Sequence, residues 1–324
     1  ILSLNISKKN IIKTLERYKA EMNQISNEIG NMFKSGKKNE AEKLKSKTQN
    51  IKNKISKLQS KLNEIEERIH NLIIKIPNIP HQSVKKGKTN KYCCEIIKTN
   101  NKKISLNKNA LPHWDLIEKF DLINFKLGNK ITGSGFPVYT NNGAKLQRAL
   151  INFFLDENIK SGYKEIIPPL LINKDSGFGT GQIPDKDDVM YYINKDDLYL
   201  IPTSEVPVTN ILRNETLNLT DLPIKYTSYT PCFRREAGSY GKDVRGLNRI
   251  HQFDKVEIVQ IVDPEKSYKV LKEMINHVEN ILIKLELPYR IIKLCGTDMS
   301  FTSALTYDFE VYSAAQKKWL EVSS

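Results

Sequence analysis

Charged and aromatic residues alternate along residues 249–262, which we expect to form a β-strand. Successive side chains of a strand point to opposite faces. One face would carry Ile250, Gln252, Asp254, Val256 and Ile258. The other face would carry Arg249, His251, Phe253, Lys255 and Glu257. Phe253 and Glu257 would stand roughly 13 Å apart, which leaves room for an aromatic base over Phe253 and a small amine or hydroxyl at Glu257.

The strand expected before it, residues 224–235, leads into a second group of charges. Arg234 and Glu236 share parity there. The planar guanidinium of an arginine matches a phosphate or a carboxylate with two parallel hydrogen bonds. These residue types therefore indicate a site for an anionic ligand. The alternative is a solvent-facing strand whose charges form cross-strand ion pairs, and the residue types alone leave both interpretations open.

The elements around this pair predict an antiparallel sheet with helices packed on it. An amphipathic helix is expected at residues 143–154 and a second at 264–285, because apolar residues recur on one helical face. The further strands are expected at residues 162–169, 198–205, 307–311 and 319–322. Strands joined mostly by loops, with helices grouped elsewhere, are typical of an α+β fold. The sequence has no internal repeat and neither a Rossmann nor a P-loop glycine pattern.

The first ninety residues follow a different pattern. Apolar residues recur at alternating intervals of three and four, interrupted by one Thr: Leu44, Thr48, Ile51, Ile55, Leu58, Leu62, Ile65, Ile69, Leu72 and Ile76. A shorter seam precedes it: Ile11, Leu15, Tyr18, Met22, Ile25, Ile29 and Met32. Two such seams joined by the polar residues 34–39 predict an antiparallel coiled-coil hairpin. Its second helix, roughly 50 Å long at about 1.5 Å per residue, is expected to stop at Pro77.

Most of the net charge of +14 lies in this region. Residues 1–90 hold twenty Lys and Arg against eight Glu and no Asp, a net charge of +12, which leaves +2 for residues 91–324. A basic segment on a nearly neutral body indicates a polyanion partner, most often a nucleic acid. A codon bias toward Lys, Asn and Ile, a solvated coiled-coil face, and a spacer or dimerisation element are the alternatives.

Composition argues against several classes of protein. No apolar run reaches the roughly 18 residues that a membrane span needs, and residues 1–6 lack the features of a signal peptide. The four cysteines have no C-x-x-C spacing: Cys93, Cys94, Cys232 and Cys295. This argues against a zinc site and a disulfide framework. We therefore expect a cytoplasmic protein without zinc, while an organellar protein that has lost its targeting peptide stays open.

Residues 233–257 hold three stretches that together form one long motif: FRREAGSYG at 233–241, RGL at 245–247 and HQFDKVE at 251–257. Together they closely resemble motif 2 of the bacterial-type seryl-tRNA synthetases, which are class II aminoacyl-tRNA synthetases. Further stretches match the family in the same order: PNIP at 77–80, HW at 113–114, PP at 168–169 in motif 1, GTGQ at 179–182, TSE at 203–205, YD at 307–308 and EVSS at 321–324. The resemblance extends over essentially the whole chain.

The resemblance implies a helical coiled-coil arm at residues 1–80, which binds tRNA, a linker at 81–110 and a class II catalytic core at 111–324. It also implies a homodimer that associates through motif 1. Family members continue with motif 3, whose arginine holds the ATP γ-phosphate. Because the chain ends at Ser324, we expect it by itself to activate serine poorly or not at all. Small departures from the family at residues 296–300 and at Leu305 put local loop geometry in doubt.

The resemblance also implies roles for individual residues. Arg234 would clamp the ATP α-phosphate and the serine carboxylate, and Glu236 would contact ATP, so these two are the expected catalytic residues. The expected serine-binding residues are Thr203, Ser204, Glu205, Arg234 and Glu257. Adenine would stack on Phe253. The other expected ATP-binding residues are Arg235, Arg249, Glu321, Val322, Ser323 and Ser324, of which Glu321 and Ser324 would also hold Mg²⁺.

The implied reaction has two steps. The carboxylate of L-serine attacks the ATP α-phosphate to give seryl-adenylate and pyrophosphate, and the seryl group then moves to the 3′-terminal adenosine of tRNA(Ser). The alternative is a non-catalytic or repurposed paralogue that binds RNA. Relatives that charge a carrier protein lack the basic arm, and a coiled-coil structural protein with an unrelated body would leave the motif 2 match unexplained.

Overall fold

The computed structural model describes residues 1–87, 94–100, 110–185, 188–236 and 245–324. These residues form two compact units, Ile1–Asn78 and Ile79–Ser324. The first unit falls within the arm expected at residues 1–80. Residues 88–93 and 101–109 of the expected linker, which include Cys93, and residues 237–244 of motif 2 lie outside the described residues.

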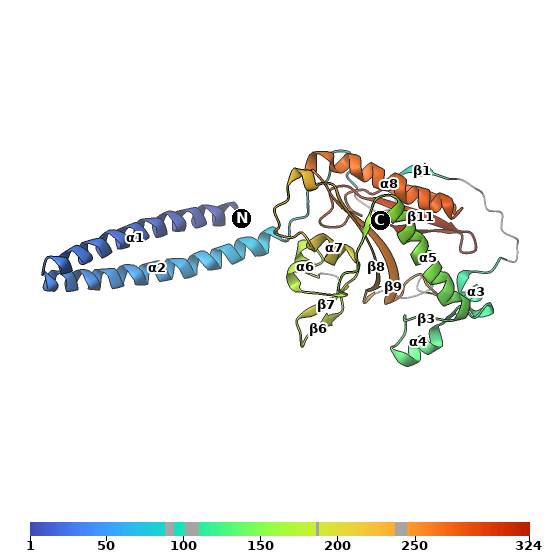
Figure 1. The fold of residues 1–324 in the computed structure, drawn as a ribbon, viewed down its shortest axis with the longest axis horizontal. Helices are drawn as coiled ribbons and strands as arrows, with labels where there is room; N and C mark the ends of the chain where they lie inside the picture. Colours follow the sequence, from blue (N-terminus) through green and yellow to red (C-terminus); the bar gives the residue numbers. More distant parts are fainter. Residues whose placement is uncertain (88–93, 101–109, 186–187, 237–244) are drawn as a thin grey trace. The chain divides into compact units, whose positions relative to one another are not determined.

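The first unit is an antiparallel hairpin of two long helices (Figure 1), which confirms the prediction from the two apolar seams. Helix α1 spans Leu2–Lys34 and helix α2 spans Lys38–Ile73. Gly36 lies in the turn with a φ of +77°, a conformation that glycine adopts without steric cost. The buried side chains are Leu15 and Ile25 in α1 and Ala41, Ile51, Leu62 and Ile65 in α2. All except Ala41 are seam positions, so burial of the apolar stripe stabilises the hairpin.

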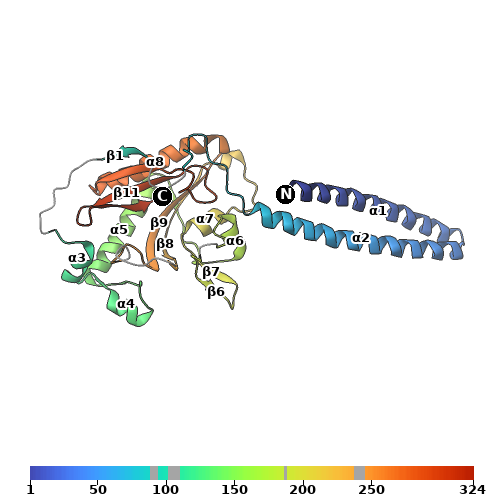
Figure 2. The same cartoon turned by 180° about the vertical axis from the view of Figure 1, so that it is seen from behind.

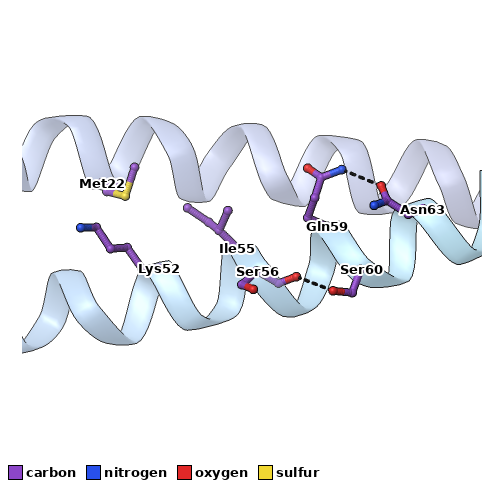
Figure 3. A pocket seen from close by; sticks show the side chains of 7 residues that line it. All are labelled: Met22, Lys52, Ile55, Ser56, Gln59, Ser60 and Asn63. Atoms are coloured by element: carbon purple, nitrogen blue, oxygen red, sulfur yellow. Dashed lines mark hydrogen bonds between the residues drawn. The ribbon is translucent and has the colours of Figure 1, made fainter.

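A groove of about 370 Å³ lies on this hairpin (Figure 3). Its lining consists of Met22 of α1 and of Lys52, Ile55, Ser56, Gln59, Ser60 and Asn63 of α2. Gln59 donates a hydrogen bond to Asn63 at 3.1 Å, and Ser60 Oγ donates to the Ser56 carbonyl at 3.2 Å. None of the residues expected to bind serine or ATP lines this groove, because all of them belong to the second unit.

The second unit contains a three-stranded sheet that holds the segment expected to carry the chemistry (Figure 2). Strand β8 (Ile224–Phe233) pairs antiparallel with β9 (Gln252–Ile261), and the short β4 (Lys164–Glu165) runs parallel to β8. Helix α5 (Asn141–Lys160) packs on β8 and β9. Asn158 of α5 is buried and donates from Nδ2 to Thr227 Oγ1 on β8 at 2.8 Å. The expected strand pair and the helix expected at 143–154 are thus confirmed.

A four-stranded antiparallel sheet completes the core of this unit. Its order is β1 (Glu95–Thr99), β10 (Tyr289–Lys293), β11 (Tyr307–Ser313) and β12 (Lys318–Ser323). Helix α8 (Ser267–Lys284) supplies Leu282 to a buried cluster with Tyr289, Ile291 and Phe309. Strand β12 carries Glu321, Val322 and Ser323, so the packing of this cluster supports part of the expected ATP site.

Strand β1 lies within residues 81–110, the range of the expected linker, so part of that range belongs to the four-stranded sheet. Lys98 of β1 forms an ion pair with Glu279 of α8, with Nζ 2.7 Å from Oε1, and the Glu279 side chain is only 6% exposed. Strand β10 would otherwise expose a row of backbone hydrogen-bonding groups, which favours the addition of a strand. The adjacent Ile96 and Ile97 break the alternation that would have predicted this strand.

The strand expected at residues 198–205 is too long. Strand β7 (Leu198–Leu200) ends early, and helix α7 (Glu205–Asn210) starts at its expected polar end. Pro202 has no N–H group for a strand ladder. The Ile201 N–H donates to the Leu170 carbonyl at 3.0 Å, and the Ile201 carbonyl accepts from the Phe233 N–H at 2.9 Å. The strand expected at 162–169 is likewise confined to β4.

Shorter elements complete the second unit: α3 (His113–Lys119), β2 (Ile123–Asn124), α4 (Phe125–Ile131), β3 (Val138–Tyr139), β5 (Leu171–Ile172), α6 (Lys174–Gly179), β6 (Tyr192–Ile193) and two 3₁₀-helices at Leu219–Asp221 and Pro264–Lys266. Strands β5, β7 and β6 form one small sheet, and β2 and β3 form another. Within the part of the chain that the structure describes, no helix has the length and apolar character needed to cross a membrane.

The buried cluster generates a stability prediction. Ile291 is 1% exposed, so Ile291→Ala should lower the free energy of unfolding by about 2–5 kcal/mol through lost burial and a cavity. Ile96 on the neighbouring edge strand is 55% exposed, so Ile96→Ala should change it by less than about 0.5 kcal/mol. Urea unfolding followed by tryptophan fluorescence measures both, because Trp114 and Trp319 are the two tryptophans of the chain and lie in the second unit. Equal losses would contradict this account of the core.

Candidate active site

The register of β8 and β9 confirms that Phe253, Lys255 and Glu257 share one face, as the alternation of side chains along a strand predicted. Cys232 lies opposite Phe253, Thr230 opposite Lys255, and Ser228 opposite Glu257. Directly opposed residues of an antiparallel pair share a face, so short side chains on β8 stand beside long ones on β9. Ser228, Thr230 and Cys232 are all buried. The long side chains of β9 therefore provide the functional groups of this face.

One end of the face holds a closed set of polar contacts around Thr203. The Thr203 hydroxyl donates to Glu257 Oε2 at 2.8 Å and accepts from the Glu205 N–H at 3.2 Å. It also accepts from Lys255 Nζ at 3.0 Å, and the same Nζ lies 2.7 Å from Glu257 Oε2. The structure thus brings Thr203 and Glu257, both expected to bind serine, into direct contact.

Glu205 belongs to the same charged group. Its side chain reaches solvent, yet surrounding protein atoms desolvate its carboxylate. This desolvation and then the Glu257 carboxylate raise the pKa of Glu205, while the Lys255 and Arg234 cations oppose the rise. Two carboxylates so close together favour the binding of a cation or of hydrogen-bond donors.

Ser204 differs from its two neighbours. Its side chain is 0% exposed, and its Oγ has no hydrogen-bond partner among the described residues. Pro202 and Val206 on either side are buried as well. The hydroxyl of Ser204 thus lies in the protein interior, whereas the serine contact expected of it stays a prediction.

The other end of the face holds Arg234 and Phe253. The guanidinium carbon of Arg234 lies 5.1 Å from the centroid of the Phe253 ring, within the range of a cation–π contact. Arg249 Nη1 pairs with Glu236 Oε2 at 3.0 Å, which joins the residues that follow β8 to those that precede β9. Glu236 has a φ of +47°, which is uncommon for a residue with a side chain.

Arg235 points to a different set of partners. Its Nε lies 3.1 Å from Asp188 Oδ2, and its guanidinium carbon lies 5.8 Å from the Tyr191 ring centroid. Its backbone N–H donates to the Val189 carbonyl at 2.8 Å. The structure therefore separates Arg235 from the contacts between Arg234 and Phe253, and its expected contact with ATP stays a prediction.

Strands β11 and β12 add the carboxylates of Asp308 and Glu321 to this end. Desolvation and then the Asp308 carboxylate raise the pKa of Glu321, whereas Arg234 and Arg249 lower it. Burial raises the pKa of Asp308, which the Ser324 hydroxyl opposes by a hydrogen bond. Val322 is exposed, and Ser323 lies opposite Phe309. Glu321 and Ser324 thus both lie near Asp308, and their expected contacts with ATP and Mg²⁺ stay predictions.

Two histidines hold the flanks of the face in place. His251 Nδ1 lies 2.7 Å from the Tyr191 hydroxyl, and its ring stacks on Phe136 with centroids 5.2 Å apart. A Cβ on Gly135 would stand 2.3 Å from His251 Cδ2, so only glycine fits there. His113 Nε2 accepts from the Leu247 N–H at 2.9 Å. These contacts position the residues of motif 2 that follow residues 237–244.

Sequence reasoning placed Lys255 on the correct face but assigned it no role. It also gave none to Asp308, whose Oδ1 is buried with no hydrogen-bond partner among the described residues.

A separate cluster of metal-ligating residue types was not expected from the sequence, because its cysteines have no C-x-x-C spacing. The ligand atoms of Cys94, Cys295 and Asp298 lie within 4.8 Å of one another. Cys94 Sγ donates to Asp298 Oδ2 at 3.0 Å, and burial raises the pKa of the Cys94 thiol. The absence of zinc stays a prediction.

Two family models match the chain. The model of the seryl-tRNA synthetase N-terminal domain matches residues 1–80. The model of the tRNA synthetase class II core domain (G, H, P, S and T) matches residues 191–324. The first match corresponds to the helical hairpin, and the second includes β8, β9 and β12.

Whole-chain comparisons agree with these matches. The serine–tRNA ligase of Salinibacter ruber is 48% identical over 100% of this chain and 76% of its own length. That of Mycoplasma capricolum is 42% identical with the same coverage. The crystal structure of seryl-tRNA synthetase from Pyrococcus horikoshii complexed with ATP superposes with a TM-score of 0.87 at 32% identity, covering 99% of this chain and 76% of that one. The expected fold and enzyme class are therefore confirmed, and this chain belongs to the seryl-tRNA synthetase family of class II ligases.

Proposed function

We propose that the complete gene product containing this chain activates L-serine with ATP to seryl-adenylate and transfers the seryl group to the 3′-terminal adenosine of tRNA(Ser). The observation that carries the proposal is the distribution of groups along one face of the β8–β9 pair. Thr203 and Glu257 are hydrogen-bonded at one end, and Arg234 stands over the Phe253 ring at the other. An amino acid needs polar and charged groups such as Thr203 and Glu257, and a nucleotide needs an aromatic ring such as that of Phe253. The Arg234 cation would stand between the two ligands.

Serine binds at the carboxylate end in this proposal. Its ammonium pairs with the carboxylates of Glu205 and Glu257, and its hydroxyl forms hydrogen bonds with the same polar group. A site built from buried polar groups rejects alanine, because the missing hydroxyl would leave those groups unpaired. Ser204 supports the position of Thr203 from the interior in this arrangement.

Arg234 acts between the two substrates. An oxygen of the serine carboxylate attacks the ATP α-phosphorus, a new phosphorus–oxygen bond forms, and the bond to pyrophosphate breaks. The step requires no protein nucleophile, because aligning two anions and neutralising the developing charge lowers the barrier. Arg234 supplies that charge, and Arg249 and Glu236 bind other parts of ATP. The Arg234 guanidinium shares the Phe253 ring with the adenine or leaves it when ATP binds.

The residues of β12 fit a divalent cation. Hard oxygen ligands such as carboxylates and hydroxyls suit Mg²⁺, and Asp308 Oδ1 is a buried oxygen without a hydrogen-bond partner among the described residues. Glu321 and Ser324 would hold the ion, with Asp308 beside them. When bound, Mg²⁺ neutralises charge on the phosphates of ATP.

The basic hairpin is the proposed site for tRNA(Ser), because residues 1–90 carry a net charge of +12 and phosphates dominate the affinity of nucleic acids.

We also propose a homodimer. Ile167, next to the expected motif 1 prolines, is 84% exposed, and burial in an interface would remove this apolar side chain from water. We also propose a cytoplasmic location for this enzyme.

Serine-dependent exchange between ATP and pyrophosphate tests the first step on the complete gene product. We expect exchange with serine and, because polar groups would be left unpaired, at least about 100-fold less with alanine. Threonine serves as the second comparison. A folded protein that binds ATP but supports no exchange with serine would overturn the proposal and favour the paralogue that binds RNA.

Replacing the stacking ring tests the nucleotide end. Phe253→Leu keeps an apolar side chain but removes the aromatic face, and stacking of a base is worth about 1–3 kcal/mol. The KM for ATP should therefore rise about tenfold or more, with the KM for serine changed less than about threefold. Phe120→Leu is the matched control, because Phe120 is 59% exposed and belongs to no expected site. A larger effect on serine than on ATP would assign Phe253 to the other substrate.

Removing the hairpin tests the tRNA proposal. Deletion of residues 8–76 should abolish tRNA charging and leave exchange intact, since residues 1–78 form a compact unit separate from the catalytic one. A second variant keeps the hairpin but replaces three exposed lysines of α2, Lys43, Lys57 and Lys61, with Gln. It should raise the KM for tRNA and weaken its dependence on salt. If the deletion reduces charging and exchange equally, the hairpin has only a structural role.

A further inference from the structure

Lys255 contacts both residues that are proposed to receive serine. Its Nζ lies 2.7 Å from Glu257 Oε2 and 3.0 Å from Thr203 Oγ1. The side chain is 31% exposed, against 14% for that of Glu257. An ion pair with partly buried partners is screened less by solvent than one on the surface. Lys255 is therefore part of the binding face rather than a solvent-exposed charge.

The hydrogen-bonding capacity of Thr203 is filled by this arrangement. A hydroxyl has one donor hydrogen and two acceptor lone pairs. Thr203 donates to Glu257 Oε2 and accepts from Lys255 Nζ and from the Glu205 N–H. These contacts fix the hydroxyl between strand β9 and helix α7 before any substrate arrives.

Glu257 is anchored through one of its two oxygens. Oε2 receives both Lys255 and Thr203, whereas no hydrogen bond to Oε1 is found within the described residues. The anchored carboxylate thus keeps one oxygen available to a ligand. Anchoring of this kind reduces the conformational freedom that binding would otherwise have to remove.

Charged and titratable groups face Glu257 from each neighbouring element. They are Lys255 on β9, Glu205 on α7 and Cys232 on β8, and a fourth group, Arg234 directly after β8, lies close to Glu205 and Cys232. Two of the four are cations, and Arg234 also contacts the Phe253 ring. Lys255 is therefore the cation that pairs directly with Glu257.

We propose that Lys255 is a positioning residue for serine: its ammonium holds Glu257 Oε2 and the Thr203 hydroxyl in place, so that Glu257 Oε1 can accept from the ammonium of the amino acid. This inference rests on the proposed function and deepens it. Lys255 does not need to touch serine to act in this way. Without the ammonium, the Glu205 and Glu257 carboxylates would repel each other more strongly, and the pKa of Glu205 would lose one of the two cations that oppose its rise.

The first experiment is Lys255→Met in the complete gene product, assayed by ATP–pyrophosphate exchange. The KM for serine should rise about 10–100-fold, as expected for the loss of a charge-assisted contact, with kcat and the KM for ATP changed less than about threefold. The acid limb of kcat/KM for serine should move to higher pH, because Lys255 opposes the rise in the pKa of Glu205 and serine requires the ionised carboxylate. Lys255→Arg should restore the limb. Lys164→Met, an exposed lysine on β4 of the same sheet, is the control.

The second experiment needs no activity. The Tm of the ligand-free wild type and of Lys255→Met is compared between about pH 4.5, near the usual pKa of a glutamate, and about pH 8. A carboxylate whose pKa is raised in the folded state costs stability once it ionises. The difference in Tm should therefore grow as the pH rises. In a Glu257→Gln background, removal of Lys255 should produce a much smaller growth.

The two experiments separate the two proposals. If the wild type shows no exchange with serine, the proposed function fails, and the Tm comparison still tests the Lys255–Glu257 coupling. A lower KM for serine in Lys255→Met would show that the ammonium only competes with substrate, and a rise confined to the KM for ATP would make Lys255 a phosphate ligand. Either result, or a difference in Tm independent of pH, would overturn the inference.

Discussion

The antiparallel pairing of β8 with β9 is the interaction on which the rest of the site depends. A strand ladder fixes which residues share a face, and here it sets Phe253 and Glu257 on one face with Lys255 between them. A shift of one residue would turn this face toward α5. Helix α5, through the hydrogen bond of Asn158 to Thr227, and the buried cluster of the second sheet hold the ladder and its surroundings together.

The charged side chains of the site contact one another or an aromatic ring. Glu236 pairs with Arg249, Glu257 pairs with Lys255, and Arg234 stands over Phe253. A buried charge without a partner is costly, and these internal contacts supply partners to the charged groups of the site. Substrate binding then exchanges one set of partners for another. The Glu205 and Glu257 carboxylates would repel each other, and the Lys255 and Arg234 cations near them reduce this repulsion.

Contacts far from the ladder give these side chains their orientation. The Ile201 carbonyl accepts from the Phe233 N–H, which places Thr203 and Glu205 beside the end of β8. Gly135 allows the close approach of His251, and His113 holds Leu247. These residues bind no expected ligand, yet each fixes a segment that does. A substitution there would alter the geometry of the site without removing any functional group from it.

The sequence by itself determined the helical hairpin, the β8–β9 pair and the face that carries Phe253 and Glu257, because periods of 3.5 and 2 are local properties of a chain. The motifs around Arg234 pointed to the family, because a run of adjacent residues is also a local property of the chain. Only the tertiary structure decided that Glu95–Thr99 forms a strand, that the helix at Glu205 replaces a strand end, and that Ser204 is buried. The contact of Lys255 with Thr203, 52 residues apart, was also decided there. Such contacts depend on which segments meet in space, and no local pattern encodes them.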